Sequence, residues 1–272
     1  MRDIFEQISE DISKGKVDPI ERAKELSRRE LPKRFYERVS VEQADGLYQV
    51  LLDGRAVKTP QRRALAFAQE HVASTVAAEW ELQEEKIDPA TMPLTRLAHS
   101  AIDAVADRPA EVIQEIGRFA GNDHLCYRAD APQELVARQE AHWEPPLKWA
   151  EDKWQGVFVR VGGMMHKEQD VDFIGRIEAS LSAFDPLELA AVHTLMSISG
   201  SAVLALALAH QAIDAESAWA AAYVDEDWNI EQWGEDAEAA RVRQFKREEF
   251  DTAVLVLSPA PEERDAAGEL LG

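Results

Sequence analysis

The sequence predicts an α+β fold in which a small antiparallel β-rich N-terminal domain, residues 1–130, precedes a mainly α-helical C-terminal domain, residues 131–272. Three observations predict it. Short runs rich in β-branched and aromatic residues occur mainly in the first quarter of the chain, and Asp-Gly pairs separate several of them. Later segments repeat their apolar residues every three or four positions. A length of 272 residues also approaches the size at which one hydrophobic core stops growing.

The first element expected is a helix over residues 18–30, because Asp18 and Pro19, followed by Glu21, form a helix-start pattern. β-Strands are predicted at residues 35–41, 47–52, 55–59 and 64–67, forming an antiparallel meander with turns at Asp45-Gly46 and Asp53-Gly54. The pair Asp53-Gly54 is the strongest signal, because a two-residue hairpin turn needs positive φ angles that Asp and Gly adopt easily. We therefore expect Asp53 and Gly54 to be structural residues.

A helix at residues 69–85 is predicted to lie on this sheet, since Val72, Val76, Ala77 and Trp80 recur at helical spacing. Trp80 is expected in the core. Further helices are predicted at residues 94–105, 110–120, 133–143, 146–154, 171–183, 186–211, 215–232 and 237–257.

Three local sequences modify this series of helices. The prolines at 145 and 146 are expected to separate two helices, because proline lacks the backbone N–H. The Ser-Gly-Ser sequence at 199–201 is expected to break or bend the helix of residues 186–211. Residues 158–161 predict a short strand, and residues 253–257 fit either a strand or the end of the last helix.

Charge disfavours nucleic acid as a partner, because the formal net charge of −21 repels a phosphate backbone. The acid is concentrated at the end: residues 214–272 contain 16 Asp or Glu and five Lys or Arg. This acidic protein would steer a basic partner toward that end, although an acidic helical surface that keeps the chain soluble gives the same pattern.

The single cysteine, Cys126, excludes an intramolecular disulfide and a cysteine-based zinc cluster, so a reducing cytoplasm is the default location. The first residues show neither an apolar secretory core nor the composition of a transit peptide. Residues 187–209 approach the length of a membrane span but contain polar residues, and we interpret them as buried core. No membrane insertion is expected.

Catalytic motifs are scarce. The sequence contains no Gly-rich phosphate loop, no Gly-x-Ser-x-Gly and no His-Glu-x-x-His, so we expect no metal, cofactor, ATP hydrolysis or small-molecule substrate. The best catalytic candidates are Asp123, His124 and Cys126, a carboxylate, imidazole and thiol close together in sequence. The alternative is a structural segment in which polar groups cap helices and Cys126 is a small buried residue.

The segment from Trp219 to Trp233 is more informative. Helical spacing places four apolar side chains and one carboxylate in a narrow stripe: Trp219, Tyr223, Glu226, Ile230 and Trp233. Val224 and Trp228 lie on the opposite side. Aromatic anchors with charged neighbours are typical of a protein-binding surface, but burial of both faces inside the domain explains the same pattern.

Several separated motifs resemble a known family, the assembly chaperones that hold the alpha subunit of the F-type ATP synthase head before it pairs with beta. The resemblance rests on KRFY at 33–36, LYQVLLDGRAVKTP at 47–60, AEWE at 78–81, MPLT at 92–95, Asp123 and CYR at 126–128, Gln139, Trp143 and Pro145, and DEDWNIEQWG at 225–234. They occur in the family's order.

This resemblance implies a chaperone without catalytic activity, cytoplasmic in bacteria and mitochondrial in eukaryotes, whose partner is the alpha subunit. It also implies that Glu226 matters to the chaperone function and Trp80 to folding. We accordingly expect Asp225, Glu226, Asp227, Trp228 and Trp233 to form the partner-binding site. Two alternatives remain: a hydrolase-like enzyme using the region of Asp123, His124 and Cys126, and a permanent structural subunit of a complex.

Overall fold

The computed structural model describes residues 31–163 and 166–259. The chain divides into two compact units, Met1–Asp103 and Ala104–Gly272. The domain boundary expected after residue 130 lies inside the second unit, between the strand Tyr127–Arg128 and the helix that begins at Gln133. The helix predicted at residues 18–30 lies outside the described residues.

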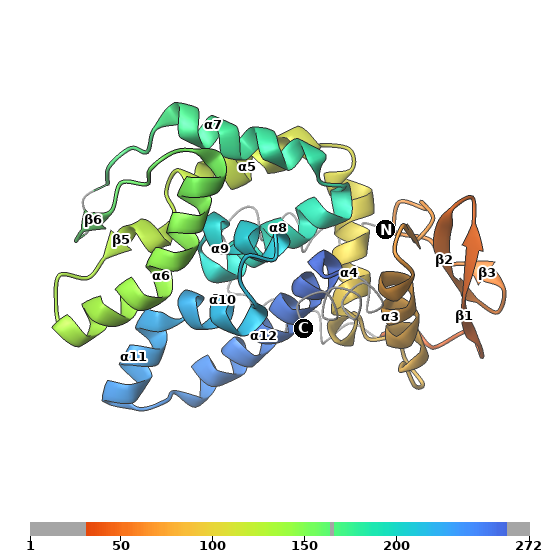
Figure 1. The fold of residues 1–272 in the computed structure, drawn as a ribbon. Helices are drawn as coiled ribbons and strands as arrows, with labels where there is room; N and C mark the ends of the chain where they lie inside the picture. Colours follow the sequence, from red (N-terminus) through yellow and green to blue (C-terminus); the bar gives the residue numbers. More distant parts are fainter. Residues whose placement is uncertain (1–30, 164–165, 260–272) are drawn as a thin grey trace, which may run out of the picture. The chain divides into compact units, whose positions relative to one another are not determined.

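The first unit contains a sheet of four strands, β1 (Val39–Ala44), β2 (Leu47–Leu52), β3 (Arg55–Ala56) and β4 (Ala66–Phe67) (Figure 1). Both predicted hairpin turns are confirmed, because Asp45, Gly46, Asp53 and Gly54 have φ angles of 53°, 80°, 49° and 76°. The meander holds only for the first three strands. β4 pairs with β2 rather than with β3, since β3 is two residues long and leaves the rest of that edge of β2 open.

Helix α3 (Glu70–Glu81) packs on β1 and β2 through Val72, Ala73 and Val76, all fully buried. The predicted stripe is therefore confirmed in this part of the helix. Trp80 differs from the expectation: it is partly exposed at the end of α3, where its ring meets Tyr36 edge-on at 5.8 Å. The Tyr36 hydroxyl also donates a hydrogen bond of 2.6 Å to the Trp80 carbonyl.

Two carboxylates hold the first unit together by binding backbone N–H groups. Asp53 accepts a hydrogen bond of 2.9 Å from the backbone N–H of Arg38, just before β1. Glu79 accepts from the N–H groups of Leu94 and Thr95 at 2.7 and 2.8 Å, and from the Thr95 hydroxyl at 2.6 Å. Glu79 thereby caps α4 (Pro93–Ser100), and this cap joins the AEWE and MPLT motifs in space.

The second unit is built from eight helices in its described residues: α5 (Pro109–Ala120), α6 (Gln133–Trp154), α7 (Val171–Ser180), α8 (Pro186–Ser199), α9 (Ala202–Ala209), α10 (Ala215–Ala222), α11 (Val224–Trp233) and α12 (Ala237–Leu257). Helix α9 is almost completely buried and is surrounded by α5, α6, α8, α10 and α12 (Figure 1). Within the described part of the chain, no helix has the length and apolarity that a membrane span requires.

Several predicted boundaries in this unit were wrong. Helix α6 runs through Pro145 and Pro146, because Trp143 and Leu147 are fully buried on either side and their packing offsets the missing backbone hydrogen bonds. The segment predicted as one helix at 215–232 is two helices, interrupted at Tyr223. The helix predicted at residues 237–257 is confirmed, and residues 253–257 form its end rather than a strand.

The second unit also contains a helix break and a small two-stranded sheet. The break at Ser199-Gly200-Ser201 is confirmed, with Gly200 at a φ of 68°. Residues 127–128 form β5 (Tyr127–Arg128), which pairs in parallel with β6 (Val161–Gly162), so strands are not confined to the first quarter of the chain. The overall α+β prediction is confirmed, since a small antiparallel sheet precedes a mainly helical region.

Candidate functional site

The segment proposed as a catalytic site is part of the interior of the second unit. Asp123 is fully buried, and its carboxylate accepts hydrogen bonds from the N–H groups of Leu125 and Val203 and from the Ser201 hydroxyl. These contacts hold the start of α9 after the break at Gly200. The carboxylate of Asp123 therefore has a structural role that explains its burial.

The other two candidate catalytic residues, His124 and Cys126, also lie among interior contacts. The His124 ring packs edge-on against Trp143 at 4.9 Å, and its Nδ1 lies 3.1 Å from the Ser199 carbonyl oxygen. Cys126 is fully buried, and burial, together with the charge of Asp123, raises the pKa of its thiol to about 12. A thiol with so high a pKa is a poor nucleophile near neutral pH.

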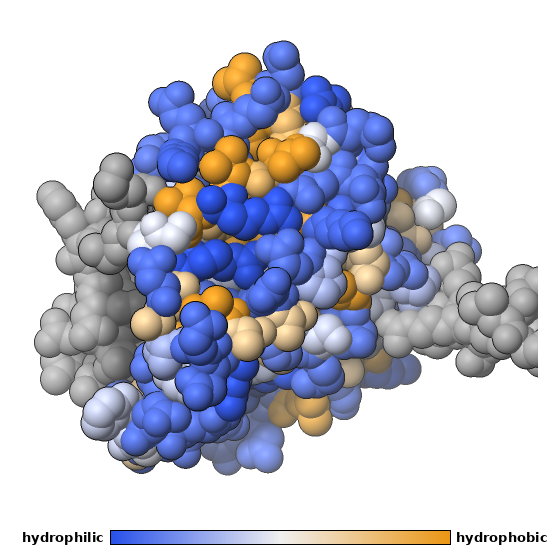
Figure 2. Space-filling view, turned by 60° about the vertical axis from the view of Figure 1, so that its left-hand side comes forward, coloured by the Kyte–Doolittle hydropathy of each residue, from blue (hydrophilic) through white to orange (hydrophobic). Residues whose placement is uncertain are grey.

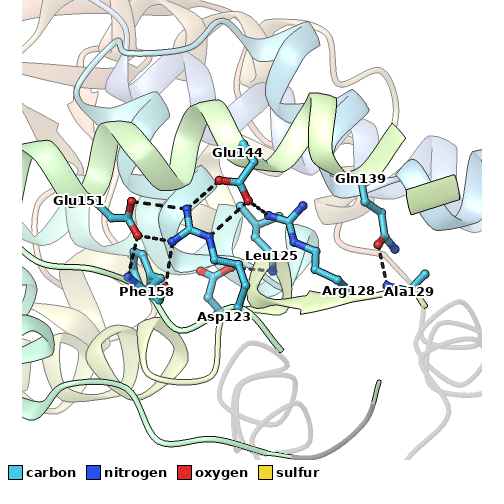
Figure 3. A network of polar contacts seen from close by, with 9 residues as sticks. Asp123, Leu125, Arg128, Ala129, Gln139, Glu144, Glu151 and Phe158 are labelled. Atoms are coloured by element: carbon cyan, nitrogen blue, oxygen red, sulfur yellow. Dashed lines mark hydrogen bonds and ion pairs between the residues drawn. The ribbon is translucent and has the colours of Figure 1, made fainter. Parts of the chain in front are cut away.

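An ion-pair network fixes β5 and β6 to α6 (Figure 3). Arg160 pairs with Glu144 at 2.8 Å and also with Glu151, both on α6, while Arg128 pairs with Glu144 at 2.6 Å. Hydrogen bonding from Arg160 lowers the pKa of Glu144, although partial burial opposes the shift. Glu144 therefore stays ionised between two guanidinium groups, that of Arg128 in β5 and that of Arg160 just before β6.

Helix α11 carries the acidic motif, and one of its faces is directed at α6. Asp225 accepts a hydrogen bond of 2.7 Å from the Gln139 side chain, whose carbonyl oxygen accepts one of 2.8 Å from the backbone N–H of Ala129 (Figure 3). The guanidinium of Arg138 lies 5.2 Å from the centre of the Trp228 ring and binds both carboxylate oxygens of Glu231. Asp225 and Trp228 thus have partners within the chain.

The other face of α11 lines a groove of about 510 Å³ against the start of α12. Its walls include Tyr223, Glu226, Ile230 and Trp233 from one side and Val242 and Arg243 from the other. The predicted stripe is therefore largely preserved despite the interruption at Tyr223. Trp219 is the exception, because it is buried against Phe250, with ring centres 5.2 Å apart.

Two carboxylates of α11 approach the groove residue Arg243 at different distances. Asp227 lies 2.5 Å from a terminal nitrogen of Arg243, while Glu226 lies 3.9 Å from the same nitrogen, beyond hydrogen-bonding distance. Burial raises the pKa of Tyr223 to about 12, with a further contribution from the charge of Glu226. The carboxylate of Glu226 therefore retains capacity to bind a donor from outside.

The structure thus separates the five predicted partner-binding residues. Glu226 and Trp233 line the groove, and Trp233 is 86% exposed. Asp225 and Trp228 face α6, and Asp227 pairs with α12 through Arg243. Reasoning from the sequence did not identify Arg138 or Arg243 as the cations that hold α11. The spacing of Arg243 and Arg247, four residues apart on the predicted helix, was a usable signal for a cationic helix face.

The face that includes β6, α6 and α11 has a mixed character. Figure 2 shows small hydrophobic patches separated by broad hydrophilic areas on this side of the molecule. Exposed large apolar side chains of the second unit include Val157, Val171, Trp233 and Val242. Isolated apolar side chains within a polar surrounding are a common composition of protein-binding surfaces.

Comparisons with known proteins agree with the motifs. The family model described as ATP12 chaperone protein matches residues 33–151. The mitochondrial atp12 protein of Schizosaccharomyces pombe is 24% identical over 238 residues, which cover 82% of this chain and 81% of that protein.

Two solved structures are similar over most of the chain. The crystal structure of the Agrobacterium tumefaciens Atu1473 protein, described as a chaperone, has a TM-score of 0.80 and 41% identity, with 91% of this chain and 94% of that chain covered. The structure of Atp12 from Paracoccus denitrificans has a TM-score of 0.78 and 34% identity, with 83% and 97% covered.

Proposed function

The chain belongs to the ATP12 chaperone family, and on that premise we propose that it is an ATP-independent assembly chaperone for the alpha subunit of the F-type ATP synthase catalytic head. It would bind the free alpha subunit, cover the surface that later contacts beta, and transfer alpha to beta. A bacterial chain of this kind would act in the cytoplasm, whereas the fission-yeast relative is described as mitochondrial.

The observation that carries this proposal is the groove between α11 and α12. The groove combines an exposed aromatic anchor, Trp233, with a carboxylate, Glu226, that is not hydrogen-bonded to its nearest internal cation, Arg243. A buried aromatic contact supplies affinity, and a charged rim supplies orientation and speed of association. These are the properties expected of a surface that recognises another protein.

The physical need for such a chaperone follows from the nature of obligate subunit interfaces. These interfaces are large and apolar, typically burying about 2,000 Å² or more, and they aggregate when unpaired. A chaperone that releases its client without nucleotide hydrolysis must bind less tightly than the final partner. A mostly polar surface with few anchors meets this requirement.

The test is suppression of aggregation of the purified alpha subunit by the full chain and by a Glu226→Gln variant. We expect Glu226→Gln to keep the wild-type melting temperature and to lose most of the protection. Glu248→Gln is the matched control, because it removes the same charge from an exposed position of α12 outside the groove wall described above. Equal protection by all three proteins would remove Glu226 from the mechanism.

The enzyme alternative is disfavoured by the contacts of Asp123 and Cys126, which leave the carboxylate saturated and the thiol protonated. The structural-subunit alternative makes a different prediction for the cell. A tagged chain should retain free alpha subunit in a pull-down and be absent from the finished synthase. Recovery with the intact synthase would favour a permanent subunit instead.

A further inference from the structure

Tyr223 lines the groove between α11 and α12, and its hydroxyl has no hydrogen-bond partner among the described residues. The side chain is only 5% exposed. Buried hydroxyl groups normally find a partner, because an unsatisfied one destabilises the fold. Tyr36 shows the usual arrangement, with its hydroxyl donating to the Trp80 carbonyl. Tyr223 therefore has the properties of a group whose partner comes from another molecule.

The surroundings of this hydroxyl favour a cation. Glu226 and Asp227 are both close enough to Tyr223 to affect its titration, and Arg243 lies 4.6 Å from the centre of its ring. Arg243 pairs closely with Asp227 at 2.5 Å and only loosely with Glu226 at 3.9 Å, so the Glu226 carboxylate keeps hydrogen-bonding capacity even though Arg243 and Lys246 also line the groove. The excess of acid in residues 214–272 acts in the same direction over a longer range.

We propose that this groove binds a positively charged side chain of the alpha subunit, with the Glu226 carboxylate and the Tyr223 hydroxyl oxygen as its two acceptors. The inference rests on the proposed function, because it specifies the chemistry of the partner at the same groove. Trp233 then covers the aliphatic part of the incoming side chain. To admit it, the guanidinium of Arg243 swings off the Tyr223 ring while it keeps its ion pair with Asp227.

The decisive variant is Tyr223→Phe, measured by calorimetric titration of the full chain with the purified alpha subunit. We expect affinity to fall about tenfold because one acceptor is lost. The free Tyr223→Phe chain should melt at or above the wild-type temperature, because it no longer buries an unsatisfied hydroxyl. Tyr36→Phe is the matched control: it removes a hydroxyl that is hydrogen-bonded inside the chain and should lower the melting temperature.

Glu226→Gln and the double variant sharpen the test. If both groups bind one cation, the double variant loses less affinity than the product of the two single losses. Glu226→Gln should also flatten the dependence of affinity on salt concentration. Tighter binding by Glu226→Gln would mean that the groove receives an anion, and would overturn the proposal.

Other results distinguish a failure of the proposed role of Tyr223 from a failure of the proposed chaperone function. Wild-type affinity for alpha in Tyr223→Phe rejects the role of the hydroxyl while leaving the chaperone function intact. A melting temperature of free Tyr223→Phe reduced as much as that of Tyr36→Phe shows an internal partner, with the same consequence. A wild-type chain that fails to bind alpha rejects the proposed function itself. Self-association of the wild type that Tyr223→Phe abolishes would identify a second copy as the occupant and overturn the proposal.

Discussion

The segment around Asp123 and the groove between α11 and α12 both place carboxylates beside aromatic side chains, but their polar atoms are engaged to different extents. Asp123 is fully buried and accepts three hydrogen bonds from within the chain. The side chain of Glu226 is 41% exposed and lies 3.9 Å from Arg243. Residue types suited to chemistry therefore indicate a binding site only where hydrogen-bonding capacity remains unused.

The largest effect expected from this difference is on the rate at which the Cys126 thiol reacts. At about pH 8, a thiol with a pKa raised to about 12 contains roughly a thousandfold less thiolate than an unperturbed cysteine. The native chain should therefore react with Ellman's reagent at least about a thousand times more slowly than the denatured chain. Rapid reaction of the native protein would show that the thiol is accessible and would restore this segment as a candidate catalytic site.

The next effect is on the free energy of unfolding, which should respond differently to substitutions of Asp123 and Glu226. Asp123→Asn places an amide N–H₂ group against hydrogen-bond donors and should lower the free energy of unfolding by about 3 kcal/mol. Glu226→Gln should change it by less than about 0.5 kcal/mol, as expected for a partly exposed side chain. Urea unfolding followed by helical circular dichroism measures both. Comparable losses in the two variants would contradict the distinction between a saturated and an available carboxylate.

The smallest effect on stability is expected at Trp233, which is 86% exposed. Trp233→Ala should change the free energy of unfolding by less than about 0.5 kcal/mol while weakening binding of the alpha subunit. Trp143→Ala is its counterpart, because Trp143 is fully buried and its indole N–H donates to the Ala221 carbonyl at 2.7 Å. That variant should lose about 4 kcal/mol. A large loss of stability in Trp233→Ala would show that this indole supports the fold.

Local signals in the sequence were sufficient to predict much of the fold. The Asp-Gly turns and the stripe on α3 depend on neighbouring residues alone, so they could be predicted without tertiary contacts. The break before α9 also follows from local chemistry, because Gly200 adopts a positive φ there. The groove residues Tyr223, Glu226, Ile230 and Trp233 were grouped correctly by helical spacing.

Features that depend on distant contacts could not be predicted in this way. Helix α6 continues through two prolines because the side chains around them are buried, which the local sequence does not indicate. The pairing of β5 with β6 joins segments more than 30 residues apart. The cap of α4 by Glu79 and the attachment of Asp225 to Gln139 likewise require knowledge of which helices meet.

The uninterrupted course of α6 has a mechanical consequence. Before the prolines Gln139 holds Asp225 of α11, and beyond them Glu151 pairs with Arg160, the residue that precedes β6. At a rise of about 1.5 Å per residue, the 22 residues of α6 form a rod about 33 Å long. Because the helix has no break at its prolines, a displacement of α11 would be transmitted along α6 to Arg160 and so to the strand beside it.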